Sequence, residues 1–152
     1  MCIFTVSLFG HRAIDDLWEL ERQLSPIIKE FMQTKSYVSF LIGRNGEFDE
    51  FAASVIKLTR RELGNENNDV TLVLPYTVSA IKDYDKYYDN IIIPESIYGA
   101  HPKSIITLKN RWMIEQSDCV IAYVKHNRGG AYSAIKYAER LNKDVINLYT
   151  KR

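Results

Sequence analysis

Arg128, Gly129 and Gly130 separate an apolar run, DCVIAYV, from a run typical of a helix that begins AYSAI. Glycine permits a tight turn and lets a ligand come close to the backbone. The unpaired N–H groups of a first helical turn, at the positive end of the helix dipole, favour a phosphate group. Ser133 could add a hydroxyl group and Arg128 a charge. The alternative is structural, since two glycines can serve only a tight turn and close helix packing.

Two other loops place polar side chains beside glycines. Gly10, His11 and Arg12 follow the first apolar run, where the arginine could pair with a phosphate and the histidine could contact a ligand or simply cap the loop. The segment GRNGEFD follows the second apolar run, and its Asp49 could bind ribose hydroxyls or serve only as a helix N-terminal charge. The candidate ligand-binding residues of these two loops are Gly10, His11, Arg12, Gly43, Arg44, Asn45, Gly46 and Asp49.

Asn110 and Arg111 lie in a predicted helix, and the arginine could reach a ligand or form a surface ion pair. With Gly129, Gly130 and Ser133, these two residues complete the predicted binding set. The chain has neither a G-x-G-x-x-G fingerprint nor a P-loop motif, and it has no G-x-S-x-G elbow. It also has no H-E-x-x-H motif and no Cys/His cluster, so we expect no metal site.

The elements that would position these residues alternate between strand and helix. Apolar runs predict strands at 2–9, 37–42, 70–74, 118–124 and 144–149, and helical periodicity predicts helices at 16–33, 48–63, 103–117 and from 130 onward, with Asp15 as the first N-cap. This alternation predicts an α/β, three-layer Rossmann-like (Rossmannoid) fold with a parallel five-stranded sheet in the order 3-2-1-4-5 and helices on both faces. Its topological switch point would bring the GHR and KHNRGG loops together, where ligands bind in such sheets.

A long irregular stretch at 75–102 holds three prolines and a group of tyrosines. The rings could form a lid that stacks on a base or sugar. They could equally cover the edge of the sheet or build a dimer interface, and we favour this structural interpretation. The tyrosines are Tyr76, Tyr84, Tyr87, Tyr88 and Tyr98.

Composition limits the function classes. The length of 152 residues predicts a single domain, 1–152. Its residues are 46% hydrophobic and 26% charged, which is typical of a globular protein. Its net charge of +1 provides no overall field that would attract nucleic acid or an anionic membrane, so we expect neither as a partner. The first residues lack the basic region and small-residue cleavage site of a signal peptide, so we expect none, and no apolar run approaches the length of a membrane span. Cys2 and Cys119 lie in apolar runs, and we expect both to be reduced, buried thiols. We therefore expect a cytoplasmic protein.

Taken in order, several short motifs resemble the SLOG (Smf/DprA–LOG) superfamily, and within it the short stand-alone bacterial proteins related to YpsA. The motifs are Gly10-His11-Arg12, residues 43–49, His101-Pro102, Asn110-Arg111-Trp112-Met113 and Gly129-Gly130-Ala131. The resemblance implies a Rossmannoid fold and a nucleotide-related ligand, such as an ADP-ribose-like or NAD-derived molecule. It also implies that the Asn110-Arg111 pair lies by the phosphate-binding edge.

One departure from the superfamily bears on catalysis. LOG-type phosphoribohydrolases carry P-G-G-x-G-T-x-x-E, and in that register Tyr132 replaces the third glycine and Lys136 replaces the glutamate. A lysine cannot supply the carboxylate that would stabilise an oxocarbenium ion or activate water. Whether the chain is an enzyme therefore stays open, and its catalytic residues stay unknown.

The leading hypothesis is a binding protein that senses or sequesters a small nucleotide derivative, with no cofactor indicated beyond that ligand. The alternatives are an enzyme of the N-glycosidic bond, with Asp49, Glu47 or Glu95 as its carboxylate, and a scaffold with a vestigial pocket. Because SLOG relatives often self-associate, the resemblance also implies a homo-oligomer, dimer or larger.

Overall fold

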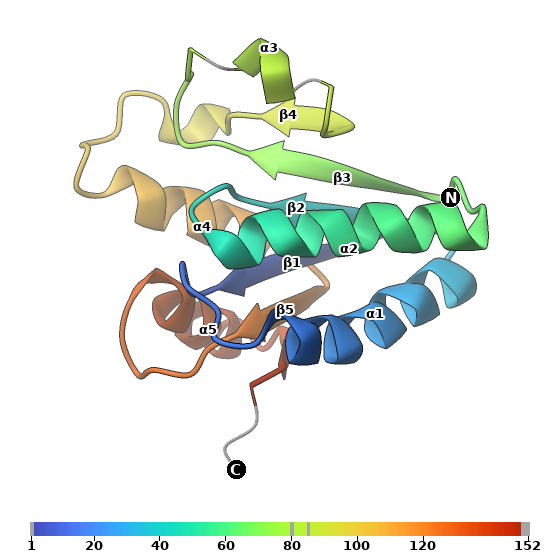
Figure 1. The fold of residues 1–152 in the computed structure, drawn as a ribbon. Coiled ribbons are helices and arrows are strands. Elements are labelled where there is room, and N and C mark those ends of the chain that lie inside the picture. Colours follow the sequence, from blue (N-terminus) through green and yellow to red (C-terminus); the bar gives the residue numbers. More distant parts are fainter. Residues whose placement is uncertain (1, 80, 85, 150–152) are drawn as a thin grey trace.

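A parallel six-stranded sheet forms the centre of the computed structural model, which describes residues 2–79, 81–84 and 86–149 (Figure 1). The strand order is β4-β3-β2-β1-β5-β6, and every neighbouring pair is parallel. The strands are β1 (Ile3–Gly10), β2 (Tyr37–Ile42), β3 (Asn68–Val73), β4 (Asn90–Ile92), β5 (Cys119–Tyr123) and β6 (Asp144–Asn147).

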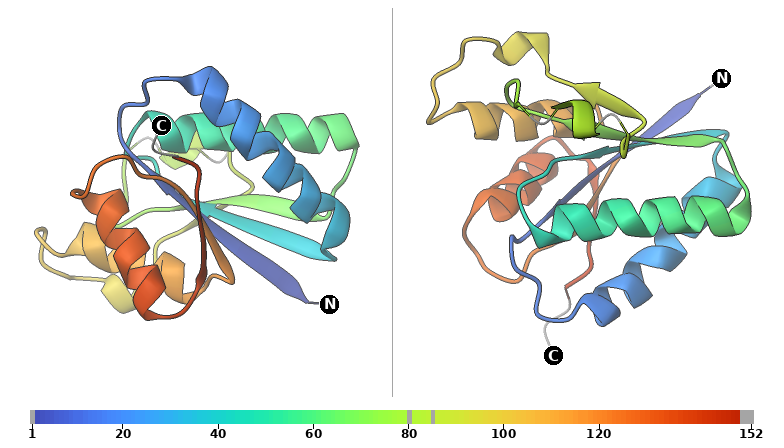
Figure 2. Two further views of the ribbon diagram at one scale, coloured as in Figure 1. Left: turned by 90° about the horizontal axis from the view of Figure 1, so that it is seen from below. Right: turned by 45° about the horizontal axis from the view of Figure 1, so that its top comes forward.

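Helices cover both faces of the sheet and make three layers. The long helices α1 (Leu17–Thr34) and α2 (Glu47–Leu63) lie together on one face, and α4 (Ile105–Glu115) and α5 (Gly130–Arg140) lie together on the other (Figure 2). The α/β class, the parallel sheet and the placement of helices on both faces are therefore confirmed.

The expected strand number was wrong, because the sheet has a sixth strand. The five predicted strands keep their relative order, and β4 adds to the edge beside β3. This strand is only three residues long and lies within the stretch predicted to be irregular, together with the short helix α3 (Ile81–Tyr84) and the turn η1 (Glu95–Ile97). Three residues show no periodicity that the sequence alone could reveal.

The tyrosine-rich stretch packs on the sheet edge and on α2. Tyr88 is 3% exposed, and its ring meets those of Tyr84 and Tyr87 edge-on. The guanidinium of Arg44 lies 4.7 Å from the centre of the Tyr84 ring. The Asp89 carboxylate accepts the Val70 N–H at 2.8 Å, which ties the end of this stretch to β3. These contacts agree with the structural interpretation; Ala80 and Asp85 lie outside the described residues.

Two local expectations need correction. The N-cap of α1 is Asp16, whose carboxylate accepts the Glu19 N–H at 3.0 Å, whereas Asp15 pairs with Lys125 at 2.9 Å. Cys2 is exposed and lies just before β1, which begins at Ile3, so the expectation of a buried thiol was wrong there. Cys119 is buried, which raises the pKa of its thiol to about 11. Among the described residues, no helix combines the length and apolar character that crossing a membrane requires.

Candidate functional site

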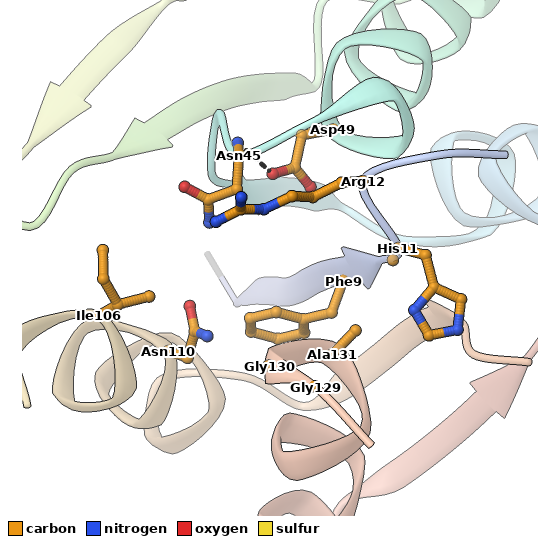
Figure 3. Close-up of a pocket in the computed structure, with 11 residues that line it drawn as sticks. Phe9, His11, Arg12, Asn45, Asp49, Ile106, Asn110, Gly129, Gly130 and Ala131 are labelled. Atoms are coloured by element: carbon orange, nitrogen blue, oxygen red, sulfur yellow. Dashed lines mark hydrogen bonds between the residues drawn. The ribbon is translucent and has the colours of Figure 1, made fainter. Parts of the chain in front are cut away.

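A cleft of about 270 Å³ opens at the carboxyl ends of β1, β2 and β5, at the topological switch point (Figure 3). One wall carries Arg12, Asn45 and Asp49, and the facing wall carries Ile106 and Asn110 with the first turn of α5. The complete lining is Phe9, Gly10, His11, Arg12, Asn45, Asp49, Ile106, Asn110, Gly129, Gly130 and Ala131. The cleft thus collects residues from loops that are far apart in the sequence.

The N-terminus of α5 forms one end of the cleft. Gly129 has a φ of 93°, which strains any L-residue, and in the described structure no side chain caps the helix. The backbone N–H groups of this turn are therefore available to an anionic ligand. Gly130 leaves room beside Asn110, since a Cβ atom there would lie 3.9 Å from the amide nitrogen.

Asn110 brings an unused hydrogen-bonding group to the same place. It is 8% exposed, and its Oδ1 atom has no hydrogen-bond partner among the described residues. Burying a polar atom without a partner costs about 1–3 kcal/mol. A ligand in the cleft could donate the hydrogen bond that this amide oxygen lacks.

The Asp49 carboxylate, in the wall that faces Asn110, lies near the buried ammonium group of Lys109, which comes from α4 and does not line the cleft. Asp49 is 6% exposed and accepts the Asn45 N–H on Oδ2 at 2.9 Å, and Lys109 is 1% exposed. Both charges converge on Gly43, where a Cβ atom would lie 2.8 Å from Lys109 Nζ and 3.3 Å from Asp49 Oδ2. Desolvation raises the pKa of Asp49 and lowers that of Lys109, and the attraction between the two charges opposes both shifts. The Asp49 carboxylate gives this wall of the cleft a hydrogen-bond acceptor.

His11 ties the two loops of the switch point together. Its Nε2 atom accepts the backbone N–H groups of Lys125 at 2.8 Å and His126 at 3.2 Å. An imidazole nitrogen that accepts hydrogen bonds carries no proton, so the ring is neutral and holds its proton on Nδ1. Burial, followed by the charges of His126 and Lys125, lowers the pKa of His11. The ring therefore holds the loop that leads to Gly129.

We expect this histidine to make stability depend on pH. The neutral form is favoured in the folded state, so the contribution of His11 is complete above its unfolded pKa of about 6.5 and is lost as the pH falls below it. The melting temperature of the wild type should fall between about pH 7.5 and about pH 5.5, and His11→Gln, which keeps an acceptor that does not titrate, should flatten this dependence. Equal slopes for the wild type and His11→Gln would refute this role.

Three of the predicted binding glycines have structural reasons to lack a side chain. A Cβ atom at Gly10 would lie 2.1 Å from Cγ of the fully buried Phe48, although Gly10 also lines the cleft. A Cβ atom at Gly46 would lie 2.5 Å from Cα of Arg12. Gly43 makes room for Lys109, as described above. These glycines let the loops after β1 and β2 pack against α2, α4 and each other.

Eight of the predicted binding residues line the cleft and five do not. Gly43 and Gly46 lie behind it as packing residues, and Arg44 turns to the tyrosine-rich stretch and to Glu50. Arg111 and Ser133 line a different groove, between α4 and α5. The predicted binding set missed three lining residues, Phe9, Ile106 and Ala131, and it also missed the buried Lys109, which does not line the cleft. A lysine at a helix position that faces the sheet was the one available signal.

No protein-family model matches the sequence, and neither does any curated protein. Solved structures do match it. DNA processing protein A (DprA) from Streptococcus pneumoniae superposes with a TM-score of 0.65 at 17% identity over 94% of this chain, and DprA from Helicobacter pylori with 0.64 at 13% over 93%. The molybdenum cofactor carrier protein of Chlamydomonas reinhardtii gives 0.58 at 15% over 93% of this chain and 74% of its own.

These likenesses establish the fold. They confirm the SLOG-type architecture implied by the sequence motifs, while the closer relation to YpsA stays a prediction. The chain spans only 49% and 63% of the two DprA chains that it matches.

The expectation that nucleic acid is not a partner was wrong. The DprA protein of H. pylori, which has this fold, binds single-stranded DNA. The expectation rested on a net charge summed over the whole chain, whereas strand binding needs only a local arrangement of cations and aromatic rings. Net charge therefore does not exclude nucleic acid for this fold.

Proposed function

We propose that the cleft binds a small nucleotide derivative that contains a ribose phosphate, such as ADP-ribose or an NAD-like molecule, and that the protein senses or sequesters it. The observation that carries this proposal is that Asn110 and the first turn of α5 lie side by side. A buried amide oxygen without a partner lies beside free helix N–H groups in one cleft wall.

The polarity of the cleft supports this ligand class. Hydrogen-bond donors lie in both walls: the N-terminus of α5 in one, and the exposed side chain of Arg12 in the other (Figure 3). The Asp49 carboxylate and the Asn110 amide oxygen accept hydrogen bonds. A ligand that satisfies both must carry anionic acceptors and neutral donors close together. The phosphate and hydroxyl groups of a ribose phosphate do so, and Ile106 offers an apolar contact for a base.

A thermal-shift panel with AMP, ADP-ribose, NAD, cyclic ADP-ribose and adenosine tests the proposal. A ligand at about 100 times its Kd adds about 2.7 kcal/mol to the free energy of unfolding, which raises the melting temperature by several degrees. Phosphorylated ligands should give this rise and adenosine should give little. Gly130→Val should abolish the rise, because its side chain fills the space in front of Asn110.

Gly130→Val should leave the melting temperature of the unliganded protein unchanged or slightly higher, because its Cβ meets no atom closer than 3.9 Å. The matched control is Thr107→Val on the exposed face of α4, which should keep the ligand shift. A flat panel for the well-folded wild type would refute the proposal and favour a scaffold. A shift that survives Gly130→Val would place the ligand elsewhere.

One observation supports an enzyme of the N-glycosidic bond as a second candidate. Of the three candidate carboxylates, Asp49 lines the cleft, whereas the Glu47 carboxylate accepts the Ile14 N–H at 3.1 Å and Glu95 lies in η1. A carboxylate there could stabilise an oxocarbenium-like transition state. Lys136 does not contribute to the cleft, since it lies over Tyr132 in the α4–α5 groove. Chromatography of the same samples for released base separates enzyme from binder.

A further inference from the structure

A second groove runs between the outer faces of α4 and α5, and it shares no lining residue with the cleft. Arg111 and Ser133, expected at the nucleotide site, both lie here. The lining is Arg111, Tyr132, Ser133, Lys136, Tyr137, Glu139 and Arg140. Because α4 and α5 cover the face of the sheet opposite α1 and α2, this groove lies on the far side of the molecule from those helices (Figure 2).

The lining of this α4–α5 groove is locally cationic although the chain as a whole is nearly neutral. Arg111, Lys136 and Arg140 are all exposed. Glu139 is the one acid in the lining, and its carboxylate lies 3.7 Å from Lys136 Nζ. Glu115, just outside, accepts the Tyr137 hydroxyl at 2.5 Å. Two arginines thus remain without a carboxylate in the groove itself.

The cations are held against aromatic rings. Two guanidinium groups lie near the centre of the Tyr137 ring, that of Arg111 at 4.9 Å and that of Arg140 at 5.4 Å. Lys136 Nζ lies 5.4 Å from the centre of the Tyr132 ring. Stacking orders an arginine side chain and leaves its N–H groups free for a phosphate. The Tyr132 and Tyr137 rings are half-buried, so part of each stays open to a ligand.

Interleaved cations and aromatic rings are the features by which proteins bind single-stranded nucleic acid, with phosphates on the cations and unstacked bases on the rings. An acidic peptide would use the cations but not the rings, and a duplex keeps its bases stacked inside. We propose that the α4–α5 groove binds single-stranded nucleic acid, with Arg111, Lys136 and Arg140 on the phosphates and Tyr132 as a platform for a base.

Fluorescence anisotropy with a labelled oligothymidylate of about 15 nucleotides, at low and moderate salt, tests the proposal. Arg111→Gln/Arg140→Gln should weaken binding at least tenfold and reduce the slope of log K against log salt by about 1.4, the value for two lost phosphate contacts on a single strand. The matched control is Lys29→Gln/Arg61→Gln, which removes the same charge from exposed positions on α1 and α2 and should bind as the wild type does.

A second pair of variants tests stacking separately from charge. Tyr132→Leu should weaken binding about fivefold or more, and Tyr132→Phe should retain it, because the ring and not the hydroxyl carries the contact. A wild type that does not bind the oligonucleotide would overturn the proposal, as would equal losses in the two double variants or stronger binding of a duplex of the same length.

The proposals for the groove and for the cleft can be tested independently. Gly130 lines the cleft and not the groove, and Asn110 is the nearest neighbour of a Cβ atom there, so oligonucleotide binding should survive Gly130→Val. Loss of oligonucleotide binding in Gly130→Val, with normal binding in Arg111→Gln/Arg140→Gln, would place the strand in the cleft and overturn the assignment of the groove.

Discussion

Replacing Lys109 with methionine should lower the free energy of unfolding by about 1–3 kcal/mol, because it leaves the buried Asp49 carboxylate without the nearby ammonium charge that attracts it. Asp49 is 6% exposed and Lys109 is 1% exposed, so water cannot solvate the carboxylate once the ammonium group is removed. Urea unfolding measures the loss. Lys103→Met is the control, since Lys103 is exposed just before α4, and it should have little effect.

A double-mutant cycle identifies the pair as the cause. Asp49→Asn preserves the acceptor for the Asn45 N–H and removes the charge. In the Lys109→Met background it should recover much of the lost stability, so the double variant should cost less than the two single variants together. Strict additivity would show that the two charges act separately and would refute the coupling.

The loss in Lys109→Met should also depend on pH. Burial already raises the pKa of Asp49, and removing the ammonium group raises it further. A carboxyl group whose folded pKa lies above its unfolded value contributes stability that is fully present below the unfolded value and is lost as the pH rises through the folded one. Relative to the wild type at each pH, Lys109→Met should therefore lose less stability near pH 5 than near pH 7.5.

Asn110→Leu should change stability and binding in opposite directions. The wild type buries the Oδ1 atom without a partner among the described residues, at a cost of about 1–3 kcal/mol, and leucine removes that cost and favours the helix. The unliganded variant should therefore melt higher than the wild type. Its ligand-induced shift should vanish, because the amide that the ligand would satisfy is gone.

Differential scanning fluorimetry with and without ADP-ribose measures both effects. Thr107→Leu, at an exposed position on the same helix, controls for helix propensity and should retain the shift. If Asn110→Leu instead melts lower than the wild type and keeps the ligand shift, Asn110 is a structural residue and the cleft loses its main support as a binding site.

Several features of the molecule could be predicted from local sequence pattern. Apolar runs bounded by glycine, proline or polar residues fixed the positions of five strands, and helical periodicity located α1 and α2 to within about two residues. Connection rules then predicted the relative order of those five strands, and hence the edge at which the loops carrying Gly10, Asn45 and Gly129 meet. These features depend on period and chirality, which neighbouring residues determine.

The direction of individual side chains required the tertiary structure. Asn110 and Arg111 are adjacent in sequence, yet one is buried in the cleft wall and the other is exposed in the α4–α5 groove, because successive helical residues point about 100° apart. Lys109 looks like an ordinary helix lysine until Gly43 and Asp49 are seen around its ammonium group. The sequence by itself determined which strand ends carry polar loops, whereas packing between distant elements decided which of those side chains share a site.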